Sequence, residues 1–378
     1  MIIIHQIYIL IYRLKYWLKK KILWKIFLGN QQKEIVLLEN ILNFVNQKNI
    51  DFKKFICLSK SQIPEQFLDK SFLSFIFFRK RRLKVKIPHI HIKNNKEFEK
   101  IYFYYRLFIL IGWLSESYKI RKYLINFKIK KEPNVIENMN RKKIFLFSKY
   151  IKKKVNFKNY YNDLSGIISN KKIAIVGPAN NKATNGKEID DFDIVIRINQ
   201  LSRENLGTRK GYKTDIIFLN GVKSDQAILQ NNLKFIKNVK IVFVKNNSYM
   251  NIFKDLGFKN VKISPNVDSY FVLGIANMLP FILFEILKYN PKKIKIFDND
   301  LMLNPKRVKN YQKYSNYRPK DFLKMLTHHD AVSQLNFVKY LFKNSKIITG
   351  DKNFNSAIKL NEKDYLRKLE TNYKLNKI

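Results

Sequence analysis

Residues 171–221 read KKIAIVGPANNKATNGKEIDDFDIVIRINQLSRENLGTRKGYKTDIIFLNG, and this stretch decides the fold. Three largely apolar runs, at 173–176, 194–196 and 215–220, have the composition of buried parallel strands. Gly177-Pro178 ends the first run as a glycine turn. A strand, a glycine loop, a polar crossover and a second strand form the plan of a nucleotide-binding α/β unit, in which backbone N–H groups approach a phosphate. An ordinary tight turn is the alternative interpretation of the glycine.

The same stretch resembles the long motif of glycosyltransferase family 29, the sialyltransferases. That motif runs from a strand through G-N-x-x-N and E-I-D-x-x-D-x-V-x-R-x-N to a G-x-[KR]-[TS]-D segment. A looser similarity to glycosyltransferase family 42, also sialyltransferases, covers the same residues. Pro178 stands where family 29 has asparagine. Both resemblances imply a nucleotide-activated sugar donor. The residues that fall in the motif's order are Gly177, Asn180 or Asn181, Glu188-Ile189-Asp190, Asp193, Arg197, Asn199 and Thr214-Asp215.

Residues 265–300 resemble the short donor motif of family 29, in which a [ST]-G turn precedes an apolar helix and a K-K-I-x-x-x-G-F-D segment. Gly274 supplies the glycine of the turn, and the apolar helix is expected over 275–287. Leu273 replaces the family's Ser or Thr, which removes a hydroxyl group expected to contact the donor. Ile296 replaces a glycine near the end of the motif.

His329-Asp330 resembles the family's H-D-x-x-x-E segment, with Gln334 in place of the glutamate. By this resemblance His329 is the general base that deprotonates the acceptor hydroxyl, and Asp330 or Gln334 orients its ring. A neutral imidazole suits the role because the pKa of histidine lies near about 6.5. Capping of the following helix is the alternative role. The family's histidine that contacts the donor phosphate has no counterpart in residues 311–318. The expected substrate-binding residues are Gly177, Asn180, Asn181, Arg197, Asn199 and Gly274.

Asp298-Asn299-Asp300 has the spelling of a metal-binding DxD sequence. Two carboxylates at positions i and i+2 are suited to hold Mg²⁺ or Mn²⁺ beside a diphosphate. The alternative is an aspartate that ends a strand and caps the following turn. We favour the second interpretation because the surrounding sequence resembles a metal-independent family. No metal and no cofactor are therefore expected.

The balance of 74 Lys and Arg against 29 Asp and Glu gives a net charge of +45, which favours anionic partners. No nucleic-acid-binding motif is visible, so an anionic membrane surface is the expected partner rather than nucleic acid. Residues 1–28 mix lysines with Trp17 and Trp24, which is typical of a helix lying in the membrane interface. A basic helix packed on the protein is the alternative. The uncharged run in this segment is too short to span a bilayer.

Cys57 is the single cysteine, so an intramolecular disulfide is excluded. Animal sialyltransferases link their two donor motifs by a disulfide, and the expected setting is therefore the cytoplasmic face of a bacterial inner membrane, with the protein bound peripherally. Residues 29–159 are expected to form a helical region and a lysine-rich connector. Within it, His89 and His91 alternate as in a strand and are interpreted as surface residues.

Residues 160–378 are expected to form a Rossmann-like α/β glycosyltransferase domain, of the modified GT-A type that the resemblance implies. The expected reaction transfers sialic acid or a related nonulosonic acid from a CMP-sugar to a glycan or lipid-linked saccharide, with inversion, in surface polysaccharide synthesis. One alternative is a metal-dependent transferase that uses Asp298 and Asp300 with a UDP-sugar. The other is a non-catalytic sialyltransferase-like scaffold, which the changes at Leu273 and Gln334 would suit.

Overall fold

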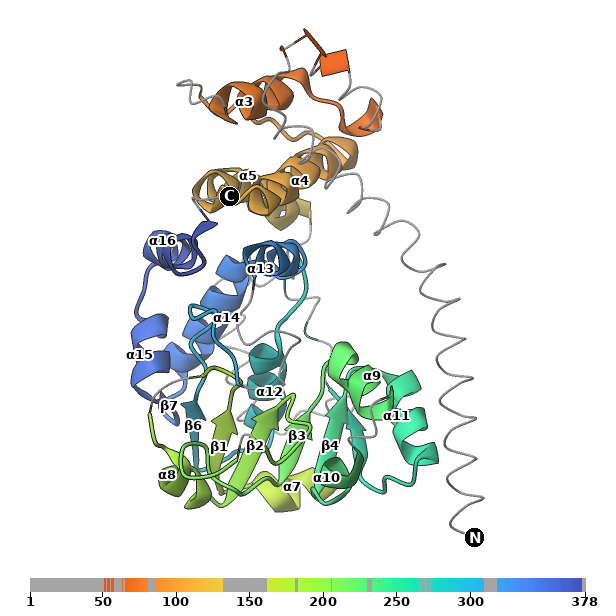
Figure 1. The fold of residues 1–378 in the computed structure, drawn as a ribbon, viewed down its shortest axis with the longest axis vertical. Coiled ribbons are helices and arrows are strands. Elements are labelled where there is room, and N and C mark those ends of the chain that lie inside the picture. The colour runs from red at the N-terminus through yellow and green to blue at the C-terminus, as the bar shows by residue number, and fades with distance from the viewer. Residues whose placement is uncertain are drawn as a thin grey trace. The chain divides into compact units, whose positions relative to one another are not determined.

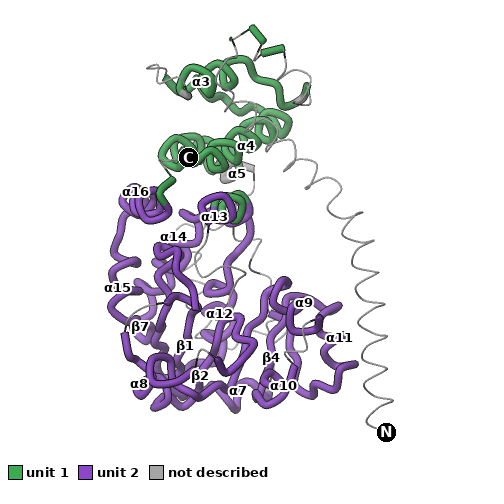
Figure 2. Tube along the Cα trace, viewed as in Figure 1, with its two compact units in different colours: residues 1–133, 323–327, 374–378 green, residues 134–322, 328–373 purple. Residues whose placement is uncertain are grey.

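The computed structural model forms two compact units, which are described separately (Figure 2). The first comprises residues 1–133, 323–327 and 374–378, and the second comprises 134–322 and 328–373. The predicted membrane-surface helix at 1–28 and Asn181 lie outside the described residues. The structure describes residues 51, 53–54, 56–57, 63, 65–80, 86–131, 162–180, 183–204, 206–229, 233–264, 267, 271, 273–308 and 318–375.

Most of the described residues of the first unit are helical. Aromatic rings join its helices: Phe72 stacks on Tyr104 with ring centroids 4.6 Å apart, and Phe75 stacks on Phe108 at 5.4 Å. The last two helices are separated at Gly112, whose φ of 81° belongs to the left-handed region that favours glycine. Its elements are η1 (Glu65–Phe67), α3 (Lys70–Lys80), α4 (Asn95–Leu110) and α5 (Leu114–Lys131).

The strand-like alternation at His89 and His91 does not produce a strand. Residues 86–93 form no regular element, and none of the described strands pairs with them. Alternation needs a neighbouring strand to become a ladder, and here the chain instead leads to Asn94, whose side chain caps α4 by accepting from the Glu97 N–H at 3.0 Å.

The second unit contains a seven-stranded sheet in the order β5-β4-β3-β2-β1-β6-β7, with every pair parallel (Figure 1). This confirms the predicted Rossmann-like α/β fold. The three predicted apolar runs form three of these strands, in which every residue except Lys172 is buried. The strands are β1 (Lys172–Val176), β2 (Ile194–Ile198), β3 (Ile216–Phe218), β4 (Ile241–Val244), β5 (Val261–Ile263), β6 (Lys293–Phe297) and β7 (Ile348–Gly350).

Helices connect and flank these strands (Figure 1). The division between the two units passes through α13. Among the described helices, no apolar run reaches the length needed to span a bilayer. The helices of this part of the chain are α7 (Asn162–Ile168), α8 (Gly186–Asp190), α9 (Gly221–Leu229), α10 (Leu233–Lys237), α11 (Asn247–Asp255), α12 (Met278–Leu287), α13 (Pro319–Leu326), α14 (Ala331–Asn344), α15 (Lys352–Ile358) and α16 (Glu362–Asn372).

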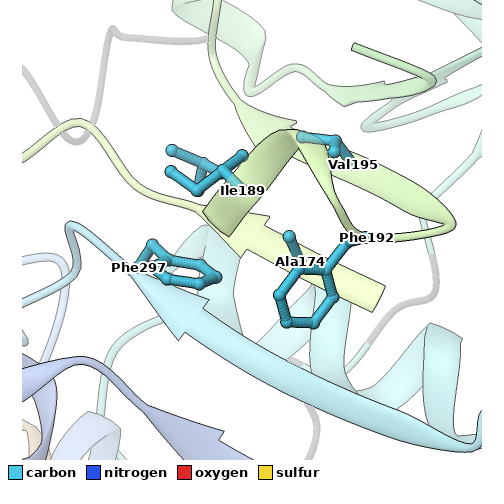
Figure 3. Packing of buried hydrophobic residues seen from close by; sticks show 6 residues of the cluster. Ala174, Ile189, Phe192, Val195 and Phe297 are labelled. Atoms are coloured by element: carbon cyan, nitrogen blue, oxygen red, sulfur yellow. The ribbon is translucent and has the colours of Figure 1, made fainter. Parts of the chain in front are cut away.

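A buried cluster packs α8 against the middle of the sheet (Figure 3). Ile189 of α8 lies over side chains from β1, β2 and β6 in this cluster. Phe192, just after the helix, meets Phe297 of β6 edge-to-face with ring centroids 5.7 Å apart. The short acidic helix is therefore fixed on one face of the central strands. The cluster consists of Ala174, Val176, Ile189, Phe192, Val195 and Phe297.

The strand order reverses at β1, because β2 to β5 lie on one side of it while β6 and β7 lie on the other. Such a switch point leaves a crevice outside the carboxyl ends of the strands, which is where open α/β sheets bind ligands. Val176 at the end of β1 is level with Phe297 of β6 and Arg197 of β2. The loops that follow β1 and β6 consequently meet at this edge of the sheet.

Candidate functional site at the switch point of the sheet

The loop after β1 lies directly against the loop after β6. The Gly177 N–H donates to the Phe297 carbonyl at 2.8 Å, and the Ala179 N–H donates to the Asp298 carbonyl at 3.0 Å. A Cβ atom on Gly177 would lie 2.4 Å from the Asp298 carbonyl oxygen, so the close approach requires glycine. Asn180, which follows, is exposed and donates its backbone N–H to the Lys306 carbonyl at 3.3 Å. The predicted glycine turn thus forms one wall of the switch point.

Lys210 reaches this point from the loop before β3. Its Nζ donates to the carbonyl oxygens of Gly177 and Ala179, both at 3.0 Å, and forms an ion pair with Asp298 Oδ2 at 2.9 Å. The residue is 7% exposed, and burial lowers the pKa of its ammonium group while Asp298 opposes that change. Sequence reasoning missed Lys210, because nothing distinguishes it from its many lysine neighbours.

The loop that delivers Lys210 is held by Asp190. The Asp190 carboxylate accepts from the backbone N–H groups of Tyr212 and Lys213 at 2.9 Å. Gly211 has a φ of 72° and lies so close to Asp190 that a Cβ atom there would be 2.3 Å from the carboxylate. Gly186 at the start of α8 is equally close to the Thr208 carbonyl. These contacts explain why acidic and glycine residues alternate with basic ones in this part of the sequence.

Arg197 holds the same loop from β2. Its Nε donates to Thr214 Oγ1 at 2.8 Å, and its Nη2 donates to the carbonyl oxygens of Lys210 and Lys213 at 2.9 and 2.8 Å. The side chain is 2% exposed, and burial lowers the pKa of its guanidinium group to about 10, against the opposing charges of Asp190 and Asp298. The predicted contact of Arg197 with substrate stays a prediction, since its recorded contacts position the loop.

Asn199 lies at the carboxyl end of β2 with a φ of 57°, a conformation that asparagine tolerates better than most residues. Its backbone N–H donates to the Phe218 carbonyl at 2.8 Å, and its side-chain Oδ1 accepts from the Asn220 N–H at 2.8 Å. Asn220 in turn caps α9 by accepting from the Lys223 N–H. Asn199 therefore ties the ends of β2 and β3 together at the same edge of the sheet as Gly177.

The second and third predicted motifs meet through Gly274 and His329. Gly274 has a φ of 79°, and a Cβ atom on it would lie 2.4 Å from the His328 carbonyl oxygen. The Ile275 N–H donates to that same carbonyl at 2.8 Å. His329, which is half-buried, donates from Nδ1 to the Ile275 carbonyl at 2.9 Å. A neutral ring with its proton on Nδ1 presents the lone pair of Nε2 as the basic nitrogen.

Gln334 also binds the loop that follows Gly274. Its Nε2 donates to the Ile275 carbonyl at 2.9 Å, and its Oε1 accepts from the Asn277 N–H at 2.8 Å. An amide satisfies both partners, whereas an ionised glutamate accepts only. Because these bonds fix residues 274–277 as a loop, α12 begins at Met278 rather than at the predicted residue 275.

The predicted role of Asp330 in orienting the imidazole ring stays a prediction, and the contacts recorded for Asp330 lie at the start of α14. Its Oδ2 accepts from the Ser333 N–H at 3.1 Å and from Ser333 Oγ at 2.5 Å, so Asp330 is the N-cap of α14. The Ile275 carbonyl orients His329. The helix-capping role that the sequence left open for His329 thus belongs to Asp330.

The two carboxylates of the DxD sequence have different partners. Asp298 is paired with Lys210, and its own N–H donates to Asp351 Oδ2 at 2.7 Å. Asp300 caps the turn after β6 by accepting from the N–H groups of Met302 and Asn304 at 3.1 and 2.8 Å, and burial raises the pKa of its carboxyl group. Within the described residues, no three His, Cys, Asp or Glu side chains gather in the arrangement of a metal site.

The loop after β6 also contacts the Gly274 loop, because Asn277 Nδ2 lies 3.5 Å from Met302 Sδ. Tyr365 of α16 donates to the Leu301 carbonyl at 2.6 Å, and Tyr373 donates to the Met302 carbonyl at 2.9 Å. These two hydrogen bonds hold the backbone of the loop after β6 in place. A continuous series of contacts therefore runs from Gly177 through the β6 loop and Asn277 to the Ile275 carbonyl that holds His329.

The structure thus brings Gly274 and His329 into contact and links them through the loop after β6 to Gly177, which Asn180 follows in the same loop. Asn181 and residues 309–317 lie outside the described part. No protein-family model and no curated protein matches the sequence.

Proposed function

We propose that this protein is a glycosyltransferase of the sialyltransferase type, with a modified GT-A domain, that moves a nonulosonic acid from a CMP-sugar to a glycan hydroxyl. The observation that carries the proposal is the series of contacts that joins Gly177 at the switch point to His329. A nucleotide-binding glycine loop and a positioned histidine are the two parts that this chemistry needs.

His329 has the properties of the general base. Donation from Nδ1 to the Ile275 carbonyl fixes the ring and its tautomer, which leaves Nε2 as the nitrogen that accepts the proton of the acceptor hydroxyl. The hydroxyl oxygen then attacks the anomeric carbon, the bond to the CMP phosphate breaks, and CMP leaves with the bonding electrons. Attack opposite the leaving group inverts the anomeric configuration.

The departing phosphate needs stabilising donors. The loop after β1 and the exposed amide of Asn180 are placed at the crevice where a phosphate would lie, and the strongly basic chain supplies a favourable potential. The pairing of Asp298 with Lys210 supports a metal-independent reaction over the UDP-sugar alternative, because that carboxylate already has a cationic partner.

Residues 1–28 would hold the protein on the cytoplasmic face of a bacterial membrane, near a lipid-linked acceptor. This segment lies outside the described residues, and its sequence combines Trp17 and Trp24, which can insert into the membrane interface, with lysines that attract anionic lipid. Deleting 1–28 should abolish co-sedimentation with anionic vesicles at low salt. Undiminished sedimentation of the truncated protein would contradict this assignment.

The activity itself is tested by incubating the full chain with CMP-sialic acid and following release of CMP, with and without saccharide acceptors. We expect CMP release that depends on His329 and persists in EDTA. If release occurs instead only from UDP-sugars with Mn²⁺, the metal-dependent alternative replaces the proposal. A wild-type protein that binds CMP but never releases it from a CMP-sugar would favour the non-catalytic scaffold.

A further inference from the structure

The ammonium group of Lys210 sits among three oxygen atoms from two different loops. These are the carbonyl oxygens of Gly177 and Ala179 at 3.0 Å and Oδ2 of Asp298 at 2.9 Å. The two carbonyl oxygens accept hydrogen bonds from the ammonium group, and the carboxylate forms an ion pair with it. The loop after β1 and the loop after β6 are both bound to this one nitrogen.

The surroundings have the character of a cation site. All three neighbours are oxygen acceptors, and one of them is a carboxylate. Their distances of 2.9 and 3.0 Å are longer than the 2.0–2.6 Å that Mg²⁺ and Ca²⁺ require. Removing the nitrogen would leave a buried carboxylate and two carbonyl oxygens without this partner, which is strongly unfavourable. The oxygens are therefore arranged for a singly charged group of ammonium size.

The side chain can hold this position because its own loop is fixed independently. Asp190 binds the backbone of Tyr212 and Lys213, and Arg197 binds the carbonyl oxygen of Lys210 itself. Neither contact involves the Lys210 amine. Truncating Lys210 should therefore leave the loop in place and open a space beside the three oxygens.

We propose that the switch point contains a monovalent-cation site whose built-in occupant is the Lys210 ammonium group, and that a free primary alkylammonium ion occupies it when the side chain is shortened. Lys210 is on this account a positioning residue. It sets the loop that carries Gly177 and Asn180 against β6, and this consequence for nucleotide binding rests on the proposed function.

The test is chemical rescue of Lys210→Ala in the full-length protein. Thermal unfolding is measured in methylammonium, ethylammonium or propylammonium chloride, against tetramethylammonium chloride at equal ionic strength. We expect the variant to melt several degrees below wild type, and a primary alkylammonium ion to restore about 3 °C or more. Tetramethylammonium has no N–H donor and should restore nothing.

Two variants serve as matched controls. Lys213→Ala removes a lysine of the same loop whose Nζ donates to the single carbonyl of Phe192, with no carboxylate. Lys210→Met removes the charge and shortens the side chain by one heavy atom only, so much less space opens than in Lys210→Ala. Neither should respond to alkylammonium, and adding Asp298→Asn to Lys210→Ala should abolish the rescue. An equal response in Lys213→Ala, or no rescue of Lys210→Ala, would overturn the proposal.

A second measurement applies if Lys210→Ala does not fold. Wild-type protein labelled with [15N]lysine should show a slowly exchanging ammonium signal from Lys210, besides those of the buried lysines Lys223, Lys262 and Lys288, and Asp298→Asn should shift or remove that one signal. Absence of a protected signal from Lys210 would refute the cation site. Rescue of melting in a protein that fails to bind CMP would leave the cation site standing and would count against the proposed function alone.

Discussion

The imidazole Nδ1 of His329 lies 2.9 Å from the carbonyl oxygen of Ile275, the residue that follows Gly274. This bond joins the histidine segment to the glycine turn of the second motif, across more than fifty residues of sequence. It also fixes which ring nitrogen carries the proton. The predicted base and the predicted donor-binding turn are therefore one structural unit.

His329→Ala should lower turnover by about 10²–10⁴-fold, the usual contribution of a general base, while CMP affinity changes little. His328→Ala is the matched control and should be much milder, since the backbone carbonyl of His328 makes the recorded contacts with the Gly274 turn. Steady-state kinetics of CMP release and calorimetric CMP binding measure the two effects. Equal losses in the two variants would assign the pair a role in folding instead.

Gln334→Glu should lower turnover by about tenfold or more, because a carboxylate next to the Ile275 carbonyl cannot donate the bond that the amide donates. The 15N shifts of the His329 ring report the tautomer directly, and we expect the fraction protonated on Nδ1 to change. Asn344→Asp, at the exposed end of the same helix, is the control. Wild-type turnover and an unchanged ring spectrum in Gln334→Glu would show that the amide is dispensable.

Arg197→Met should destabilise the protein by about 3–5 kcal/mol, since it removes a buried cation and leaves several carbonyl oxygens without their donor. Lys187→Met, at an exposed position of α8, should change stability by less than about 0.5 kcal/mol. Urea unfolding measures both free energies. If Arg197→Met is as stable as wild type but no longer binds CMP, the guanidinium contacts substrate, as the sequence predicted.

Much of the fold was predictable because the apolar runs of β1 to β5 are short, β-branched and separated by polar segments. The resemblance named Gly274 and His329 as site residues, whereas their direct contact was not predicted. Lys210 was not predictable, because an ion pair between a loop lysine and Asp298 leaves no periodic signal in a chain so rich in lysine. The bond between His329 and the Ile275 carbonyl was not predictable for another reason, because every residue has a backbone carbonyl and the sequence does not indicate which one a side chain contacts. Arg197 and Asp330 were expected at the substrate, whereas their recorded contacts organise a loop and a helix end.

Lys223 is buried at the start of α9, and its ammonium group should make the stability of the protein depend on pH. Burial lowers the pKa of its ammonium group to about 8, below the ordinary value of 10.5. Between these values the unfolded chain binds more protons than the folded one, so the contribution of Lys223 to stability rises with pH. Lys223→Met should therefore be more stable than wild type at pH 7, with an advantage that shrinks from about pH 8 to pH 10. A constant difference across this range would contradict the lowered pKa.

The central claim is that the switch point binds a cytidine monophosphate group without a metal. Isothermal titration calorimetry of the full chain with CMP, in EDTA, tests it most directly, with UMP and UDP as comparison ligands. The account predicts saturable one-to-one CMP binding in EDTA, weaker binding of UMP and UDP, and no gain on adding Mn²⁺. Binding of UDP only in the presence of Mn²⁺, or no binding of any of these nucleotides, would contradict the account.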